Sequence, residues 1–130
     1  MFIDKNVDVS SLSPLTLAFL GDAVYDVLAR EYVVSLANRP TNELNKMSVS
    51  IVNATSQYKA TKKISEFLTE EEMVVFKRGR NAHANHGAKS AGSAEYHAST
   101  GLEALFGYLY LKGENERIVF LFNEIIKNEN

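Results

Sequence analysis

Two acidic residues stand where the chain is otherwise apolar. Asp22 lies within residues 17–25, whose other members are apolar, aromatic or glycine, and Glu103 is the only acid in residues 99–111. A buried carboxylate without a partner costs several kcal/mol, so each acid needs a cation, a hydrogen-bond network or a cleft. Gly21 costs up to about 1 kcal/mol relative to Ala in a helix, which indicates that something approaches the backbone beside Asp22 closely.

The chemistry that these two acids favour is the binding of a hard divalent cation. If their helices pack together, Asp22 and Glu103 meet inside the fold, and like charges that close raise each other's pKa unless a cation lies between them. Oxygen ligands alone favour Mg²⁺, with Mn²⁺ as a substitute, and such ions serve phosphoryl transfer. The alternative is that each acid pairs with an internal Arg30, Tyr25 or Tyr96, and the pattern leaves both interpretations open.

The apolar residues recur with helical spacing nearly throughout, and no stretch alternates long enough for a sheet, so we predict an all-α fold. Ser13 and Pro14 are a typical helix start, and the helix over about residues 15–37 is apolar on most sides, which predicts central burial. The pattern predicts five more helices: one capped by Thr41 and running through Val52, one over 56–68, one beginning at the capping box Thr69–Glu72, one from Ser93 to a stop at Gly113, and one over 114–127.

Basic residues gather in one part of the chain, although the net charge of the whole is −2. Residues 77–94 contain no acid and carry Lys77, Arg78, Arg80 and Lys89. The net charge weighs against a nucleic-acid binder, whereas the local excess of cations favours one. We predict a basic loop over about residues 79–92, a long break of the kind that is often functional. The alternative is a solvated loop whose charge is incidental.

Length and composition set further bounds. The 130 residues correspond to a single domain, with residues 1–12 as a lead-in. The chain contains no cysteine, which excludes disulfides, thiolate metal sites and cysteine nucleophiles. Its start does not read as a secretory signal, and no apolar run is long enough to cross a bilayer without meeting a charge. We therefore expect a cytoplasmic protein.

Several short motifs together resemble the ribonuclease III family. Residues 19–24, Phe-Leu-Gly-Asp-Ala-Val, resemble the family's signature helix, and residues 102–107, Leu-Glu-Ala-Leu-Phe-Gly, resemble its second catalytic helix. Residues 77–82, Lys-Arg-Gly-Arg-Asn-Ala, with Ser99-Thr100 ahead of Glu103, resemble the subfamily called mini-ribonuclease III. The similarity runs in the correct order from about Leu15 to the end of the chain.

The resemblance implies a dimeric endonuclease of double-stranded RNA. Asp22 and Glu103 would be its catalytic and metal-binding residues, and Lys77, Arg78, Arg80, Asn81 and Lys89 would bind RNA. It also implies 5′-phosphate and 3′-hydroxyl products and a role in trimming the 23S ribosomal RNA precursor. The sequence leaves open whether ribosomal proteins take part on that substrate. We expect no appended RNA-binding domain, so the catalytic dimer itself would grip the duplex.

The sequence also departs from full-length ribonuclease III. Leu15, Ala18 and Thr100 stand where the full-length enzymes carry further acids. The mini subfamily lacks those acids too, so we expect one firmly held Mg²⁺ per site, with water and RNA phosphate completing its shell.

Two other functions compete with the nuclease. A catalytically inactive helical dimer that binds structured RNA as a ribosome-assembly factor would share the fold and the basic loop, but would hold no metal at Asp22 and Glu103. A metal phosphohydrolase of small nucleotides is disfavoured, because the chain has no adjacent His-Asp pair of the kind that helical phosphohydrolases use.

Overall fold

The computed structural model describes residues 2–82 and 93–127, and over these residues it is helical, without a strand. The helices are α1 (Pro14–Leu36), α2 (Thr41–Val52), α3 (Ala54–Ile64), α4 (Glu70–Asn81), α5 (Ser93–Leu111) and α6 (Asn115–Ile126), with short 3-10 turns at Val9–Ser11 and Ser65–Phe67. The predicted all-α fold is confirmed. In the part of the chain described, no helix is both long and apolar enough to span a membrane.

Several helix ends follow from capping chemistry that the sequence predicts. The Ser13 side chain accepts a hydrogen bond from the backbone N–H of Thr16 at 3.2 Å, with Pro14 in the first turn of α1. Thr69 and Glu72 form the predicted capping box of α4. Gly113 adopts φ +74° after α5, a backbone conformation that L side chains rarely adopt. These contacts satisfy terminal backbone groups that no helical partner can reach.

Two helix starts differ from the prediction. Thr41 does not cap α2, because Pro40 occupies the N-cap position, where no side chain makes a capping hydrogen bond. α3 begins at Ala54 rather than at residue 56, because the Asn53 side chain accepts a hydrogen bond from the backbone N–H of Ser56 at 2.8 Å. An asparagine is among the best N-caps, and it moves the helix start two residues forward.

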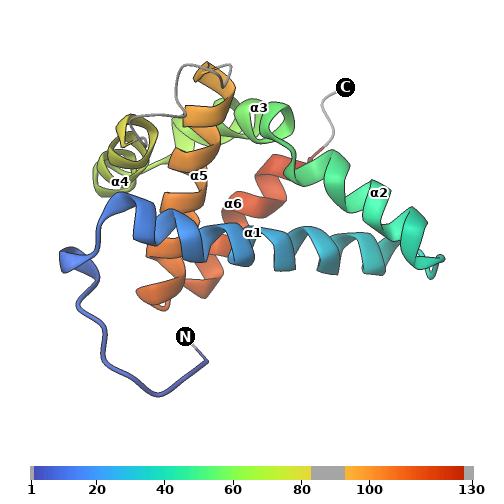
Figure 1. Ribbon diagram of the computed structural model, residues 1–130, viewed down its shortest axis with the longest axis horizontal. Helices are drawn as coiled ribbons and strands as arrows, with labels where there is room; N and C mark the ends of the chain where they lie inside the picture. The colour runs from blue at the N-terminus through green and yellow to red at the C-terminus, as the bar shows by residue number, and fades with distance from the viewer. Residues whose placement is uncertain (1, 83–92, 128–130) are drawn as a thin grey trace.

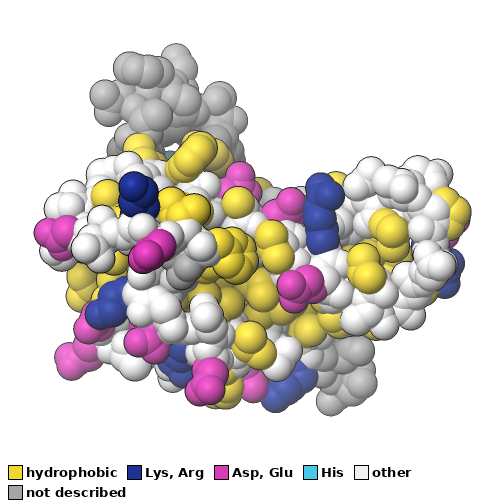
Figure 2. Space-filling view, turned by 90° about the horizontal axis from the view of Figure 1, so that it is seen from below, with side chains coloured by type: hydrophobic (Ala, Val, Ile, Leu, Met, Phe, Trp, Pro, Cys, Tyr) yellow, Lys and Arg dark blue, Asp and Glu magenta, His cyan; other side chains and the backbone are white. Residues whose placement is uncertain are grey.

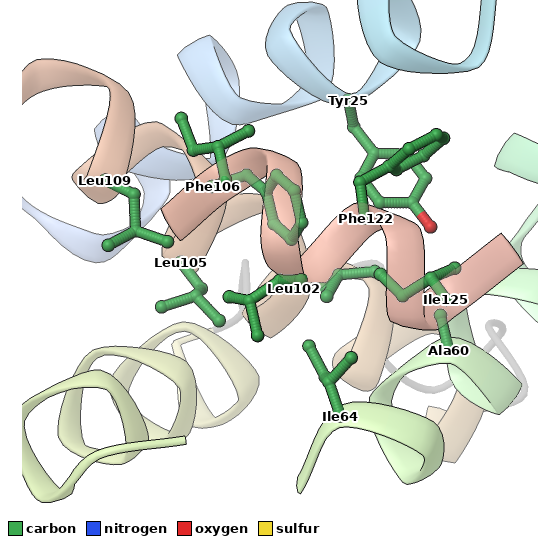
Figure 3. Close-up of a cluster of buried hydrophobic side chains, with 11 residues drawn as sticks. Tyr25, Ala60, Ile64, Leu102, Leu105, Phe106, Leu109, Phe122 and Ile125 are labelled. Carbon is green, nitrogen blue, oxygen red and sulfur yellow. The ribbon is translucent and has the colours of Figure 1, made fainter. Parts of the chain in front are cut away.

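Helix α5 runs through the middle of the fold, with α1, α3, α4 and α6 around it (Figure 1). Its residues Leu102, Leu105 and Phe106 are completely buried. The aromatic centre of the core joins three helices: the Tyr25 ring meets the rings of Phe106 and Phe122 edge to face, at centroid distances of 5.2 and 5.7 Å (Figure 3).

Helix α1 is buried on one side only, so its predicted burial on most sides is wrong for the single chain. Leu17, Tyr25 and Ala29 face the core. The opposite side leaves Phe19 83% exposed and Val27 53% exposed. The reason is that α1 lies along the edge of the fold, where α5 covers one of its faces (Figure 1). Seen from below, hydrophobic side chains gather across the middle of the molecular surface (Figure 2).

Helices α1 and α5 cross in direct backbone contact. A Cβ added to Gly21 would lie 1.6 Å from the carbonyl oxygen of Glu103, and one added to Gly107 would lie 2.1 Å from the carbonyl oxygen of Leu17. Only glycine at both positions permits this approach. The close neighbour that Gly21 predicted is therefore the backbone of α5, at the residue that carries the second acid.

Candidate active site

The crossing of α1 and α5 brings Asp22 and Glu103 together. Gly21 rests on the backbone of Glu103, and Asp22 follows it in the chain. The two carboxyls are close enough to interact through their charges and through a hydrogen bond. The prediction that Asp22 is buried is wrong, since its side chain is exposed, whereas Glu103 is partly buried. The pair therefore lies at the surface of the protein, where a large substrate can reach it.

Burial and charge act on Glu103 in the same direction. Burial, followed by the negative charge of Asp22, raises the pKa of Glu103 from 4.5 to about 7. A hydrogen bond from the Gln57 side chain opposes this rise. A carboxyl in such a setting gives up its proton readily only when a positive charge arrives. The site is thus electrostatically suited to a cation.

The described residues supply no such charge. Arg30 forms its ion pair with Asp26, at 3.2 Å, and not with Asp22. The buried hydroxyl of Tyr25 has no hydrogen-bond partner, and Tyr96 is 46% exposed. Within residues 2–82 and 93–127, no Lys or Arg forms an ion pair with either acid of the site. The alternative in which Arg30 or Tyr25 neutralises these acids is therefore wrong.

The donor set fits a hard divalent cation that keeps much of its water. Asp22 and Glu103 offer carboxylate oxygens, and in the described ranges they belong to no group of three or more His, Cys, Asp and Glu. The Thr100 hydroxyl donates to the backbone carbonyl of Tyr96 at 3.1 Å. Two carboxylates plus water and phosphate oxygens are a common environment for Mg²⁺.

Two polar residues near Glu103 were missed by the sequence analysis. Gln57 of α3 is 2% exposed, and Ser99 of α5 is 8% exposed. The Ser99 hydroxyl donates to the Gln57 side-chain oxygen at 2.5 Å. A signal for Gln57 did exist, because it precedes Ala60 and Ile64 in the stripe of α3 that faces the core. An amide in an apolar helical stripe calls for a buried partner.

The predicted RNA-binding residues lie on α4 as far as the structure describes them. The predicted loop start at residue 79 is wrong, because α4 continues through Asn81. Gly79 is part of the helix and packs on α5, where an added Cβ would lie 3.0 Å from the Cα of Gly101. This contact is two residues before Glu103 along α5. Lys89 lies outside the described residues.

The cations around Gly79 differ in their exposure. Lys77 and Arg78 are exposed, and Arg80 is partly buried, with its guanidinium 5.9 Å from the centre of the Phe76 ring. The Nε of Arg80 donates to the Asn81 side-chain oxygen at 3.3 Å. These side chains flank the last turns of α4, whose buried face is fixed to α5. The structure therefore places a basic helix end beside α5, the helix that also carries Glu103.

Comparison with known proteins identifies the family of this fold and site. The sequence profile described as Ribonuclease III domain matches residues 15–114. The chain belongs to the ribonuclease III family. Among its relatives is Mini-ribonuclease 3 of Clostridium tetani, which is 40% identical over 94% of this chain and 86% of its own length. Mini-ribonuclease 3 of a Thermoanaerobacter species is 47% identical over 85% of this chain and 78% of its own length.

A solved structure supports the same assignment. A Fusobacterium nucleatum protein determined by X-ray crystallography is similar to this fold with a TM-score of 0.83, at 36% identity, and the match covers 95% of each chain. The predicted resemblance to mini-ribonuclease III is thereby confirmed, and the chain is an endoribonuclease of the ribonuclease III family.

Proposed function

We propose that this protein is a Mg²⁺-dependent endonuclease that cuts double-stranded RNA as a homodimer. The observation that carries the proposal is the meeting of Asp22 and Glu103 at the α1–α5 crossing, where no Lys or Arg of the described ranges forms an ion pair with either acid. Two adjacent carboxylates at an open surface cost free energy unless they bind something positive. In a nuclease, the cation that the two carboxylates bind also stabilises the negative charge on the phosphodiester.

Asp22 and Glu103 would have different roles in binding the cation. Asp22 and Glu103 would hold the ion, Asp22 from the exposed side and Glu103 from the partly buried side. A bound Mg²⁺ supplies Lewis-acid chemistry that neutralises charge developing on a phosphate. Glu103 must be deprotonated to serve as a ligand, so its raised pKa makes cation binding release a proton near neutral pH. Asp22, being exposed, faces the side from which the duplex approaches.

The basic end of α4 would hold the RNA backbone, together with Lys89. A-form RNA is recognised mainly by its shape and by phosphate and 2′-hydroxyl contacts, which suit the exposed side chains of Lys77, Arg78 and Asn81 and the adjacent Arg80. Replacing both Arg78 and Arg80 with Ala should weaken duplex binding and reduce the salt slope by about two ion equivalents. The matched control is Arg39→Ala, since Arg39 is exposed and paired with Glu43 at the start of α2. Equal salt slopes in all three proteins would remove α4 from RNA binding.

The outward face of α1 supports a dimer. Leu15, Phe19, Val27 and Val34 are 45%, 83%, 53% and 63% exposed on this one helix. Next to them lies a cleft of about 500 Å³, lined mainly by apolar side chains of α1 and α6. An exposed apolar surface of this extent is typical of an interface between proteins. A second copy there would place two carboxylate pairs along one duplex, each cutting one strand.

The proposed substrate in the cell is the 23S ribosomal RNA precursor, processed in the cytoplasm. What supports it is the similarity to proteins named Mini-ribonuclease 3 together with the motifs that resemble that subfamily. Incubating the protein with precursor transcripts and mapping the ends would test this part separately from the chemistry. Cleavage of generic duplexes without a defined cut in the precursor would count against the ribosomal role alone.

One gel tests the enzymatic proposal. Duplex RNA, single-stranded RNA and duplex DNA are incubated with and without Mg²⁺, and we expect only duplex RNA with Mg²⁺ to be cut. Asp22→Asn and Glu103→Gln should abolish cleavage. The charge-matched controls Asp4→Asn and Glu116→Gln change exposed acids elsewhere and should leave it intact. Duplex binding without cleavage under any metal condition would favour the inactive assembly factor instead.

A further inference from the structure

We infer that Gln57 and Ser99 form a positioning pair that holds the Glu103 carboxylate in place for cation binding. The inference rests on the proposed function, because it assigns these residues a task at the same site. Neither residue needs to touch RNA or the ion. Gln57 would act through Glu103, and Ser99 would act through Gln57.

The pair is arranged as a relay across the α3–α5 interface. Ser99 and Glu103 are four residues apart on α5 and so lie on one face of that helix. Gln57 reaches them from α3, and its side chain is almost completely buried. The Ser99 hydroxyl donates to the Gln57 oxygen, and the Gln57 side chain lies near enough to Glu103 to oppose the rise of its pKa. One amide thus connects a fixed hydroxyl with the carboxylate.

The chemistry of the three groups fixes the direction of the relay. A carboxylate only accepts hydrogen bonds, so Gln57 must turn its NH₂ end toward Glu103. That leaves the Gln57 oxygen facing Ser99, which has a hydroxyl proton to donate. The Ser99 hydroxyl binds the opposite end of the amide, so it reinforces the orientation that the Glu103 carboxylate favours. Ser99 therefore keeps Gln57 in the orientation that serves Glu103.

A neutral donor suits a metal ligand better than a cation would. A lysine or arginine at position 57 would hold the Glu103 carboxylate too, but it would also compensate its charge and compete with the ion. The Gln57 amide holds the side chain and leaves its negative charge available. Carboxylate ligands of metals are commonly oriented by such hydrogen bonds, and losing one costs about 10–100-fold in metal affinity or activity.

The test measures Mn²⁺ binding to the RNA-free protein by calorimetry. Gln57→Met removes the amide at similar volume and should weaken Mn²⁺ binding about tenfold or more. Ser99→Ala should weaken it to a lesser extent, and Ser99→Thr, which keeps the donor, should restore it. The matched control is Ser48→Ala, because Ser48 is 5% exposed and its hydroxyl has no hydrogen-bond partner. In cleavage assays the loss should appear in kcat with KM for duplex RNA unchanged.

The outcomes separate this inference from the proposed function. If wild type binds Mn²⁺ and Asp22→Asn does not, but Gln57→Met and Ser99→Ala bind as wild type does, the positioning role is refuted and the metal site stands. If wild type shows no Asp22-dependent Mn²⁺ binding, both proposals fall. Circular dichroism and urea unfolding check the fold of every variant. Should Gln57→Met not fold, the comparison of Ser99→Ala with Ser99→Thr decides.

Discussion

The contact between α1 and α5 can be tested with a single methyl group. In Gly21→Ala, the added Cβ would lie 1.6 Å from the carbonyl oxygen of Glu103 and 2.8 Å from the backbone nitrogen of Gly107. Ordinary contact begins at 3.4 Å. Both neighbours are backbone atoms of a buried helix, so no side chain can rotate away. The two helices must therefore move apart locally until the added Cβ comes close to ordinary contact distance from these backbone atoms.

Two opposing effects set the size of the change. Alanine is favoured over glycine inside a helix by up to about 1 kcal/mol. Overpacking a well-packed core costs about 1–3 kcal/mol, and a clash between backbones belongs at the upper end of that range. We therefore expect Gly21→Ala to lower the free energy of unfolding by about 2 kcal/mol. The separation also moves Asp22 away from Glu103, and Mg²⁺ tolerates only small departures from ligand distances of about 2.0–2.1 Å.

Urea unfolding and duplex cleavage, measured on the same preparations, test both consequences. The control is Gly113→Ala, which costs about 1–2 kcal/mol of backbone strain but meets nothing within 4 Å. Gly113→Ala should be less stable yet keep its cleavage rate under conditions where it is folded, whereas folded Gly21→Ala should lose cleavage. A Gly21→Ala protein that is as stable as wild type or more stable would refute the close crossing, because helix propensity alone predicts a gain in stability.

Three more predictions concern charge and surface. Arg117→Met should lower the unfolding free energy at pH 7 by about 2 kcal/mol, because it leaves buried Glu72 without its partner at 2.8 Å. Burial alone would raise the pKa of Glu72, but the hydrogen bonds from Arg117 and Thr69 hold it below 4.5. The difference in unfolding free energy between wild type and Arg117→Met, measured by urea titration, should therefore shrink once the pH falls through that pKa. Metal-free Glu103→Gln should be more stable than wild type by about 1–2 kcal/mol at pH 8 and by less at pH 5. The reason is that the pKa of Glu103 in the folded protein, about 7, lies above the ordinary 4.5, so wild type loses stability as the pH rises between these values. A stability difference between the two proteins that does not change with pH would contradict this. Phe19→Glu should halve the mass measured by sedimentation and leave the circular dichroism spectrum unchanged, because Phe19 is 83% exposed in the single chain. An unchanged mass would exclude this face of α1 from the dimer interface.

The sequence made parts of the fold predictable because local chemistry decides them. Ser13 with Pro14, the Thr69–Glu72 capping box and the turn at Gly113 depend on neighbours within a few residues, so their residue types are informative on their own. The meeting of Asp22 with Glu103 was also predictable, although 81 positions separate them. An acid in an apolar helix needs a partner, and two apolar helices in a small domain are expected to pack against each other, which brings their acids together.

What could not be predicted depends on which side of a helix another element covers. The residues of α1 are apolar on most sides, which is equally consistent with burial in the chain and with burial by a second copy. Gln57 and Ser99 were missed for a related reason: their roles arise only when α3 lies against α5, and polar residues in helices are usually solvated. The end of α4 was misplaced because the predicted loop began at residue 79, whereas Gly79 lies inside the helix and permits contact with α5.

Helix α1 connects the site to the outer surface through its geometry. Successive helical residues point about 100° apart, so Gly21 faces α5, Asp22 points to the side, and Ala23 turns toward solvent. Asp22 therefore stands on the seam between the buried face of α1 and the face that carries Phe19 and Val27. A second copy that covers the outer face would border Asp22 directly and remove water from one side of the carboxylate pair. Dimer formation and cation affinity should consequently be coupled, and the monomer produced by Phe19→Glu should bind Mn²⁺ more weakly than the dimer although its site residues are unchanged.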